Sequence, residues 1–113
     1  MRKNIININE ITVKNFVESI RPNEDLRDKI DIGYYYSNLV IELFKTRPDW
    51  EIPSEKNKIP FARIKYVKTK NEWKLFWFRA SEKWELYEPF PNSSHLSAIL
   101  DCIKKDKHGC FFG

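Results

Sequence analysis

Residues 61–88 read FARIKYVKTKNEWKLFWFRASEKWELYE, and this stretch decides the fold. Apolar and charged residues alternate within it over three runs, at residues 61–68, 73–79 and 83–88. Alternation with a period of two is typical of strands that bury only one face. Short polar segments separate the runs, so we expect a three-stranded antiparallel meander.

Two-residue turns, at Lys70-Asn71 and at Ser81-Glu82, would decide which side chains share a face of this meander. One face would be mainly apolar, with Ile64, Tyr66, Trp73, Leu75, Trp77, Trp84 and Leu86. The opposite face would be basic and aromatic, with Arg63, Lys65, Lys74, Phe76, Phe78, Lys83 and Tyr87. A slip of one residue in either turn would exchange these sets.

Two further strands are expected before the meander, at residues 30–36 and 39–45. They flank Ser37-Asn38, where Asn tolerates the left-handed backbone that a tight hairpin needs. Residues 46–60 contain three prolines among charged residues, which predicts a long loop.

An amphipathic helix is predicted over residues 8–21, capped by Asn7 or Asn9, and residues 23–29 suggest a further helical turn. A last helix is expected to start at Ser93 or Ser94, with a stripe formed by Leu96, Ile99, Leu100 and Ile103, and to end at Gly109.

The expected fold class is therefore α+β. An antiparallel meander of about five strands is flanked by an N-terminal and a C-terminal helix. The 113 residues, 42% of them hydrophobic, fit one domain over residues 1–113 and do not fit a disordered tail.

No run approaches the roughly 18 apolar residues of a membrane-spanning helix, and the N-terminal residues lack the apolar core of a signal peptide. Two cysteines provide no disulfide framework, so we expect a cytoplasmic protein without membrane contact.

The basic residues are concentrated in the middle of the chain. Residues 55–83 contain nine basic and three acidic residues, a net charge of +6, whereas the rest of the chain carries −2. Most of the aromatic residues of the meander lie in the same region. The whole-chain charge of +4 therefore understates a basic, aromatic centre.

Several segments of the second half resemble a known family. Residues 42–50 (ELFKTRPDW) match its E-L-x-x-x-R-P-x-W element, and residues 63–66 are also similar. Residues 73–79 and 83–87 follow its W-x-L-Y-W-x-R-x-x-x-K-W-x-x-Y signature. The ending at residues 108–113 (HGCFFG) is similar to its H-G-C-F-W-G tail.

The family is the bacterial domain-of-unknown-function family numbered 3024, and the resemblance covers about residues 40–113. This chain departs from the pattern at Phe76, Glu85 and Phe112, where the family pattern has Tyr, His and Trp. The resemblance implies a bacterial, cytoplasmic, single-domain protein, and it implies no activity.

The basic and aromatic face of the meander is the main candidate for function. Sheets that bind nucleic acid stack bases on exposed aromatic rings and neutralise phosphates with neighbouring Lys or Arg. The candidate binding residues of this kind are Arg63, Lys65, Lys74, Phe76, Phe78, Lys83 and Tyr87. The alternative is that these rings pack under a helix or a partner subunit, while the basic side chains lie over them.

Arg47 and Trp50 are further candidates at the start of the expected loop. Arg47 could clamp a phosphate or a carboxylate with two hydrogen bonds. The alternative is structural: Arg47 would bond to loop carbonyls while Trp50 covers the edge of the sheet.

Two carboxylate patterns suggest chemistry, and each has a simpler explanation. Pro48-Asp49 followed by Glu72-Trp73-Lys74 spells the PD-(D/E)-x-K motif of metal-dependent nucleases, but the scaffold of that motif is not expected here. Glu42 and Lys65 form a possible acid–base pair, which a cross-strand ion pair explains more simply.

Cys102, Cys110, His108 and His95 do not show the paired spacings of a zinc site. A Cys–His nucleophile is equally unsupported, because His108 has no evident orienting partner. We therefore assign no catalytic residue, no metal and no cofactor.

The leading interpretation is a small, dimeric, non-enzymatic binding module that uses the basic and aromatic face, with nucleic acid as its ligand. The alternative is a module for homodimerisation or for binding another protein through that face. A metal-dependent nuclease is the remote alternative.

Overall fold

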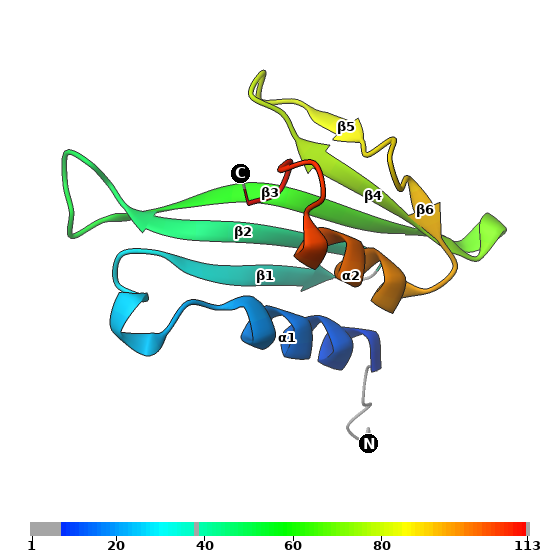
Figure 1. Cartoon of the computed structure of the whole chain (residues 1–113), viewed down its shortest axis with the longest axis horizontal. Helices are drawn as coiled ribbons and strands as arrows, with labels where there is room; N and C mark the ends of the chain where they lie inside the picture. The colour runs from blue at the N-terminus through cyan, green and yellow to red at the C-terminus, as the bar shows by residue number, and fades with distance from the viewer. Residues whose placement is uncertain (1–7, 38, 113) are drawn as a thin grey trace.

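The computed structural model describes residues 8–37 and 39–112. Figure 1 shows how the helices pack against the sheet. The elements in chain order are α1 (Ile8–Ile20), η1 (Glu24–Leu26), β1 (Asp31–Ser37), β2 (Val40–Pro48), β3 (Lys56–Val67), η2 (Lys68–Lys70), β4 (Glu72–Phe78), β5 (Trp84–Leu86), β6 (Asn92–Ser93) and α2 (Leu96–Lys105). The α+β meander with a helix at each end is confirmed.

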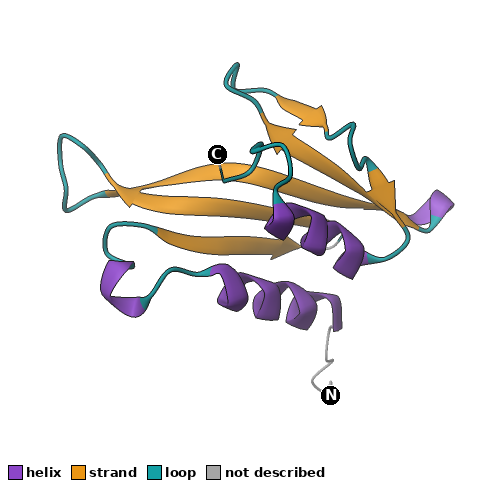
Figure 2. Cartoon of the chain, in the orientation of Figure 1, coloured by secondary structure: helices purple, strands orange, loops and turns teal. Residues whose placement is uncertain are grey.

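The sheet has the strand order β1-β2-β3-β4-β5, and every pair is antiparallel. The short strand β6 also pairs with β4, beyond the end of β5. In Figure 2, α2 lies over one side of the sheet and α1 runs along the β1 edge, where it also contacts α2. They therefore divide the sheet into a helix-covered face and an opposite face.

The core lies between the sheet and the helices. Its buried side chains come from both layers: Val13 and Val17 of α1, Ile41, Leu43, Ala62, Ile64, Trp73 and Leu75 of the sheet, and Leu96, Ile99, Leu100 and Ile103 of α2. The apolar stripe predicted for the last helix is confirmed, because its four members are all buried.

Two hairpins have turns that differ from those predicted but keep the predicted faces. Ser37 pairs with Val40 in the first hairpin, and Leu39 takes the left-handed backbone with a φ of 71°. Asn38, which was predicted to do so, lies outside the described residues. In the β3–β4 hairpin, Val67 pairs with Glu72 across η2. Each register differs from the prediction by two residues, and an even shift leaves every side chain on its face.

The β4–β5 turn is one residue longer than predicted, and this reverses the faces of β5. Phe78 pairs with Trp84, and the N–H of Arg79 donates to the carbonyl of Lys83. The loop thus holds three residues, 80–82, of which Glu82 has a φ of 63°. An odd shift moves each β5 side chain to the other side of the sheet.

The predicted loop over residues 46–60 is wrong, because most of this segment belongs to strands. β2 continues to Pro48 and β3 begins at Lys56. Pro60 is tolerated because the β2–β3 register shifts beside it, where Phe44 pairs with Pro60 and Leu43 with Ala62. Only residues 49–55 connect the two strands.

None of the predicted helix caps that fall within the described residues is found. Asn7 lies outside the described residues, whereas Asn9 lies within α1. The residue that precedes α2 is His95, so the prediction that Ser93 or Ser94 caps this helix is wrong. The Oγ of Ser93 instead accepts a hydrogen bond of 3.0 Å from the backbone N–H of His95.

α2 ends at Asp106, which has a φ of 43°, rather than at Gly109. The Asp106 carboxylate accepts hydrogen bonds of 3.0 Å and 2.8 Å from the N–H groups of Phe111 and Phe112. This carboxylate folds the C-terminal segment back, and Phe111 becomes part of the core. An Asp at the left-handed position is favoured here because Gly could not supply these bonds.

Candidate nucleic-acid interface

The sheet face opposite the helices combines basic and aromatic side chains. The strand registers place on it, from β1 to β5, Tyr35, Glu42, Phe44, Lys58, Arg63, Lys65, Lys74, Phe76, Phe78, Trp84 and Leu86. We call these residues the basic-aromatic face. Within residues 8–37 and 39–112, neither helix lies over it (Figure 2).

The centre of the basic-aromatic face is a layered contact around Arg63. The guanidinium carbon of Arg63 lies 4.4 Å from the ring centroid of Trp84, and the Trp84 ring lies 5.0 Å from that of Phe78. A guanidinium over an indole ring is a favourable cation–π contact. Arg63 also forms a 2.9 Å ion pair with Glu42, which offsets its charge. This group is a fixed platform rather than the main source of positive charge.

Two lysines that face each other supply free positive charge. Lys65 of β3 and Lys74 of β4 are directly opposite in the register, and like charges in this position repel each other. The Nζ of Lys65 lies 5.9 Å from the ring centroid of Phe76. Among the ion pairs of the described residues, none includes Lys65 or Lys74. A bound anion would relieve this repulsion.

A second group lies nearer the β1 edge. The Nζ of Lys58 is 3.0 Å from the hydroxyl oxygen of Tyr35 and 5.1 Å from the ring centroids of both Tyr35 and Phe44. The Tyr35 side chain is half exposed, whereas Phe44 beneath it is buried. A cation therefore lies over aromatic rings at three places on this face: Arg63 over Trp84, Lys65 over Phe76, and Lys58 over Tyr35 and Phe44.

The predicted binding residues of the meander separate into three groups. Five of them lie together on the basic-aromatic face: Arg63, Lys65, Lys74, Phe76 and Phe78. Lys83 directly follows the β4–β5 loop and precedes the first residue of β5. Tyr87 is 2% exposed and belongs to the core, so its prediction as a surface residue is wrong.

The longer β4–β5 turn explains the errors at this edge. It brings Trp84 and Leu86, which were predicted on the apolar face, onto the basic-aromatic face. Glu82 takes the left-handed backbone in this turn, a conformation usually adopted by Gly or Asn. The length of the turn could therefore not be predicted from the sequence. Trp84 is thus the aromatic residue of the basic-aromatic face that the sequence pattern misplaced.

The comparisons with known proteins give a family. A family model described as "Domain of unknown function (DUF3024)" matches residues 2–113. The chain belongs to this family. The match extends the resemblance of residues 40–113 to the N-terminal helix. Comparison with curated proteins and with solved structures found no match.

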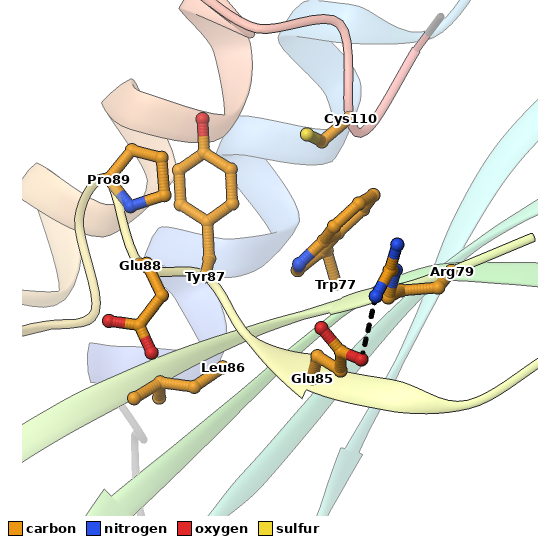
Figure 3. Close-up of a pocket in the computed structure, with 8 residues that line it drawn as sticks. All are labelled: Trp77, Arg79, Glu85, Leu86, Tyr87, Glu88, Pro89 and Cys110. Carbon is orange, nitrogen blue, oxygen red and sulfur yellow. Dashed lines mark hydrogen bonds and ion pairs between the residues drawn. The ribbon is translucent and has the colours of Figure 1, made fainter.

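Segments that carry the DUF3024 resemblance meet on the helix-covered side of β5. A cleft of about 270 Å³ lies there. Figure 3 shows Trp77 and Tyr87 beside each other in it, with Cys110 of the tail above them. Arg79 forms a 2.9 Å ion pair with Glu85 at its rim and lies 5.3 Å from the Trp77 ring centroid. The departure from the DUF3024 pattern at Glu85 thus provides an ion-pair partner for Arg79.

The cysteines of this DUF3024 chain are unsuited to nucleophilic chemistry. Burial, followed by the nearby carboxylate of Asp106, raises the pKa of the Cys110 thiol. Burial also raises the pKa of the Cys102 thiol. Both side chains stay protonated near neutral pH, and the thiol is a weaker nucleophile than the thiolate. Within residues 8–37 and 39–112, no three His, Cys, Asp or Glu side chains form a group that could hold a metal ion.

The PD-(D/E)-x-K residues lie at opposite ends of the sheet. Asp49 follows the end of β2 that pairs with Lys56, whereas Glu72 pairs with Val67 at the other end of β3. These ends are roughly 35 Å apart at about 3.3 Å per residue. One metal ion cannot contact both carboxylates.

Glu42 pairs with Arg63 rather than with Lys65, so the proposed Glu42–Lys65 pair is wrong.

Arg47 and Trp50 lie at the far end of the β2–β3 hairpin, away from Lys65 and Lys74. Arg47 is exposed near the end of β2, and the Trp50 side chain is 87% exposed. Trp50 therefore does not cover the sheet edge. Asp49 fixes the conformation of this loop, because its carboxylate accepts hydrogen bonds from the N–H groups of Glu51 and Ile52.

Within the described residues, no helix is long and apolar enough to cross a membrane.

Proposed function

We propose that this DUF3024 protein is a small binding module whose basic-aromatic face contacts single-stranded nucleic acid. The observation that carries the proposal is the pairing of Lys65 with Lys74 on a sheet face that also presents Phe76, Phe78 and Trp84. Lysines bind phosphates, and aromatic side chains stack on bases. A bacterial, cytoplasmic setting, as the family resemblance implies, fits this ligand.

The shape of the face favours single strands over duplexes. An open sheet lets unpaired bases lie flat on aromatic rings, as in other sheet-based binders of single strands, whereas the bases of a duplex are stacked on one another. The Arg63–Trp84–Phe78 layers would hold one base, and Lys58 with Tyr35 would offer a second contact near the β1 edge. The proposed interaction is sequence-tolerant, because every base has a flat ring.

Charge reversal on the basic-aromatic face tests the proposal. Lys65→Glu with Lys74→Glu should weaken binding of a fluorescently labelled 12-nucleotide single strand by at least about tenfold in 50 mM salt, as followed by anisotropy. The matched control is Lys14→Glu with Lys104→Glu, since it changes the net charge equally at exposed positions on α1 and α2. The control should bind within about twofold of the wild type.

Two results would contradict the proposal. The first is a wild-type protein that binds no single strand at low salt. The second is an equal loss of affinity in both double variants, because net charge alone would then explain the binding. Circular dichroism should show the same secondary structure in all three proteins.

The dependence on salt provides a second check. If about three phosphates are neutralised, the logarithm of the binding constant should fall with the logarithm of the salt concentration with a slope near −2 for a single strand. Affinity would then fall roughly twentyfold between 50 and 200 mM salt. A slope near zero would exclude phosphate contacts.

A protein partner is the second candidate for this face. The observation that favours it is the enrichment of Arg and aromatic side chains, which is also typical of protein interfaces. A protein ligand would be indicated if oligonucleotides fail to bind while the Phe76→Asp variant disrupts an association of the wild-type protein.

A further inference from the structure

The loop between β2 and β3 forms a rigid tip at the end of a projecting hairpin (Figure 1). The N–H of Asp49 donates to the carbonyl of Glu55, and the Asp49 carboxylate accepts from Glu51, Ile52 and the side chain of Asn57. These bonds explain why the pKa of Asp49 lies below its usual value. The loop therefore has a fixed shape before it meets any partner.

This tip presents apolar side chains to solvent. Trp50 is 87% exposed and Ile52 is 51% exposed. An indole ring held in water on an ordered loop is unfavourable for an isolated molecule, and Trp is among the residues that most often dominate binding energy at protein interfaces. The exposed apolar side chains of the tip are therefore typical of a surface that binds a protein partner.

The charge of the tip identifies the chemistry of that partner. Residues 49–55 contain three acidic residues and no basic residue. Glu51 and Glu55 are both exposed, in the same seven-residue loop as Trp50. Carboxylates in this position repel phosphates, so the tip does not extend the proposed nucleic-acid site. It fits a surface that is both basic and aromatic.

The chain itself carries such a surface, but each copy cannot use its own. Lys56, at the base of the tip, and Lys65 are nine residues apart along β3. This separation is about 30 Å at 3.3 Å per residue. Because the hairpin is paired along its whole length, it cannot fold back to cover Lys65 and Lys74. Only the tip of another molecule can reach them.

We propose that the tip, residues 49–55, docks on the basic-aromatic face of a second copy of this chain. Trp50 and Ile52 pack against the aromatic rings of that face, and Glu51 and Glu55 approach its Lys65 and Lys74. The two surfaces that meet are different, so the contact is heterologous, and each copy has one of each. A tip of seven residues buries a small area, so the association is weak.

A single-stranded nucleic acid and the tip of a second copy would compete for the same lysines. Adding an oligonucleotide therefore dissociates the assemblies. The self-association itself does not depend on nucleic-acid binding, because it requires only the two surfaces of the protein. The two proposals can fail separately.

The test is sedimentation velocity of the full chain from 5 to 500 μM in 50 mM salt, with two variants. The tip variant is Trp50→Ala with Ile52→Ala, and the face variant is Lys65→Glu with Lys74→Glu. We expect the average mass of the wild type to rise with concentration and each variant alone to stay monomeric. Lys14→Glu with Lys104→Glu is the matched charge control and should associate like the wild type.

Mixing the two variants gives the decisive result. The face variant retains an intact tip, and the tip variant retains an intact face, so a 1:1 mixture should form heterodimers. A wild type that is monomeric at 500 μM would overturn the inference. It would also be overturned by a tip variant that associates like the wild type, since the tip would then take no part in the contact. A mixture that stays monomeric would overturn it too, since an intact tip and an intact face would then not bind each other.

Discussion

Gly33 provides the space that positions one of the rings of the basic-aromatic face. A Cβ atom at this position would lie 2.8 Å and 2.9 Å from two carbons of the Phe44 ring. Phe44 is buried, and its ring centroid is 4.8 Å from that of Tyr35, so it has little freedom to move away. The absence of a side chain in the middle of β1 thus lets Phe44 lie beneath Tyr35 and Lys58.

Gly33→Ala should therefore lower the free energy of unfolding by about 1–2 kcal/mol, because an added methyl group overpacks this site. Urea unfolding measures the change. The same substitution in a Phe44→Leu background should cost clearly less, since the smaller side chain leaves room. Equal costs in the two backgrounds would show that Phe44 is not the obstacle.

Asp31 connects the start of the sheet to the end of α1. Its two carboxylate oxygens accept hydrogen bonds of 2.9 Å and 2.8 Å from the guanidinium of Arg21. These bonds, assisted by the N–H of Ile32, lower the pKa of Asp31 below its ordinary value of 3.8. The contact therefore stabilises the folded state fully above the unfolded-state pKa, and this contribution is lost as the pH falls through the folded-state pKa.

Asp31→Asn should accordingly reduce stability at pH 7 and flatten its decline below about pH 4. Urea unfolding between pH 7 and pH 2.5 measures both effects. Asp25→Asn, at an exposed carboxyl of η1, is the control and should leave the acid limb of the profile unchanged. If the Asp31 variant loses stability in acid as steeply as the wild type, the Arg21–Asp31 contact does not contribute.

At the scale of elements, the β4–β5 turn decides which surface Trp84 joins. Its left-handed residue is Glu82, with a φ of 63°, and the N–H of Glu82 donates to the carbonyl of Arg79 over 2.8 Å. A residue with a Cβ atom pays a penalty of roughly 1–2 kcal/mol in this conformation, which Gly avoids. The pairing of β4 with β5 therefore imposes this turn on Glu82, a residue that does not favour the left-handed conformation.

Glu82→Gly should therefore raise the free energy of unfolding by about 0.5–1 kcal/mol, because part of the relief is offset by the greater freedom of Gly in the unfolded chain. Glu82→Ala is the control, since Ala keeps the Cβ atom, and it should give no gain. Thermal unfolding compares the two variants. An equal stability of both would mean that the turn carries no backbone strain.

The same element shows what the sequence could and could not predict. Hydrophobic periodicity predicted both helices and all strands of the meander, because burial of one face imposes that pattern. It could not predict turn lengths, since neither Leu39 nor Glu82 is a usual left-handed residue. Two of the three turns differed by an even number of residues and preserved the faces, whereas the third exchanged Trp84 with Tyr87.

The hairpin of β2 and β3 gives a second example. Pro48, Pro53 and Pro60 suggested a long loop, because Pro usually interrupts a strand. Pro48 instead ends β2 and Pro60 lies at a register shift, so only Pro53 is in the loop. The sequence pattern therefore placed both Arg47 and Trp50 at the start of a long loop, whereas Arg47 lies in β2 and only Trp50 lies in the short connection that follows it.

At the scale of the whole molecule, the two helices leave one sheet face uncovered. Residues 55–83 carry the net positive charge of the chain, and several of their basic residues, among them Arg63, Lys65 and Lys74, lie on that face in β3 and β4. The opposed lysines Lys65 and Lys74 do not contribute to the packing of the core. They are the reason why we propose this face, rather than the cleft beside Tyr87, as the binding surface.

The most direct test is a titration of the ¹⁵N-labelled protein with a 12-nucleotide single strand in 50 mM salt, followed by the shifts of the amide signals. The account predicts that the largest shifts come from β3, β4 and β5, around Lys65, Lys74 and Trp84. The signals of α1 and α2 should stay in place. Shifts confined to the helices or to the cleft beside Tyr87, or no shifts at all, would contradict the claim that the basic-aromatic face binds nucleic acid.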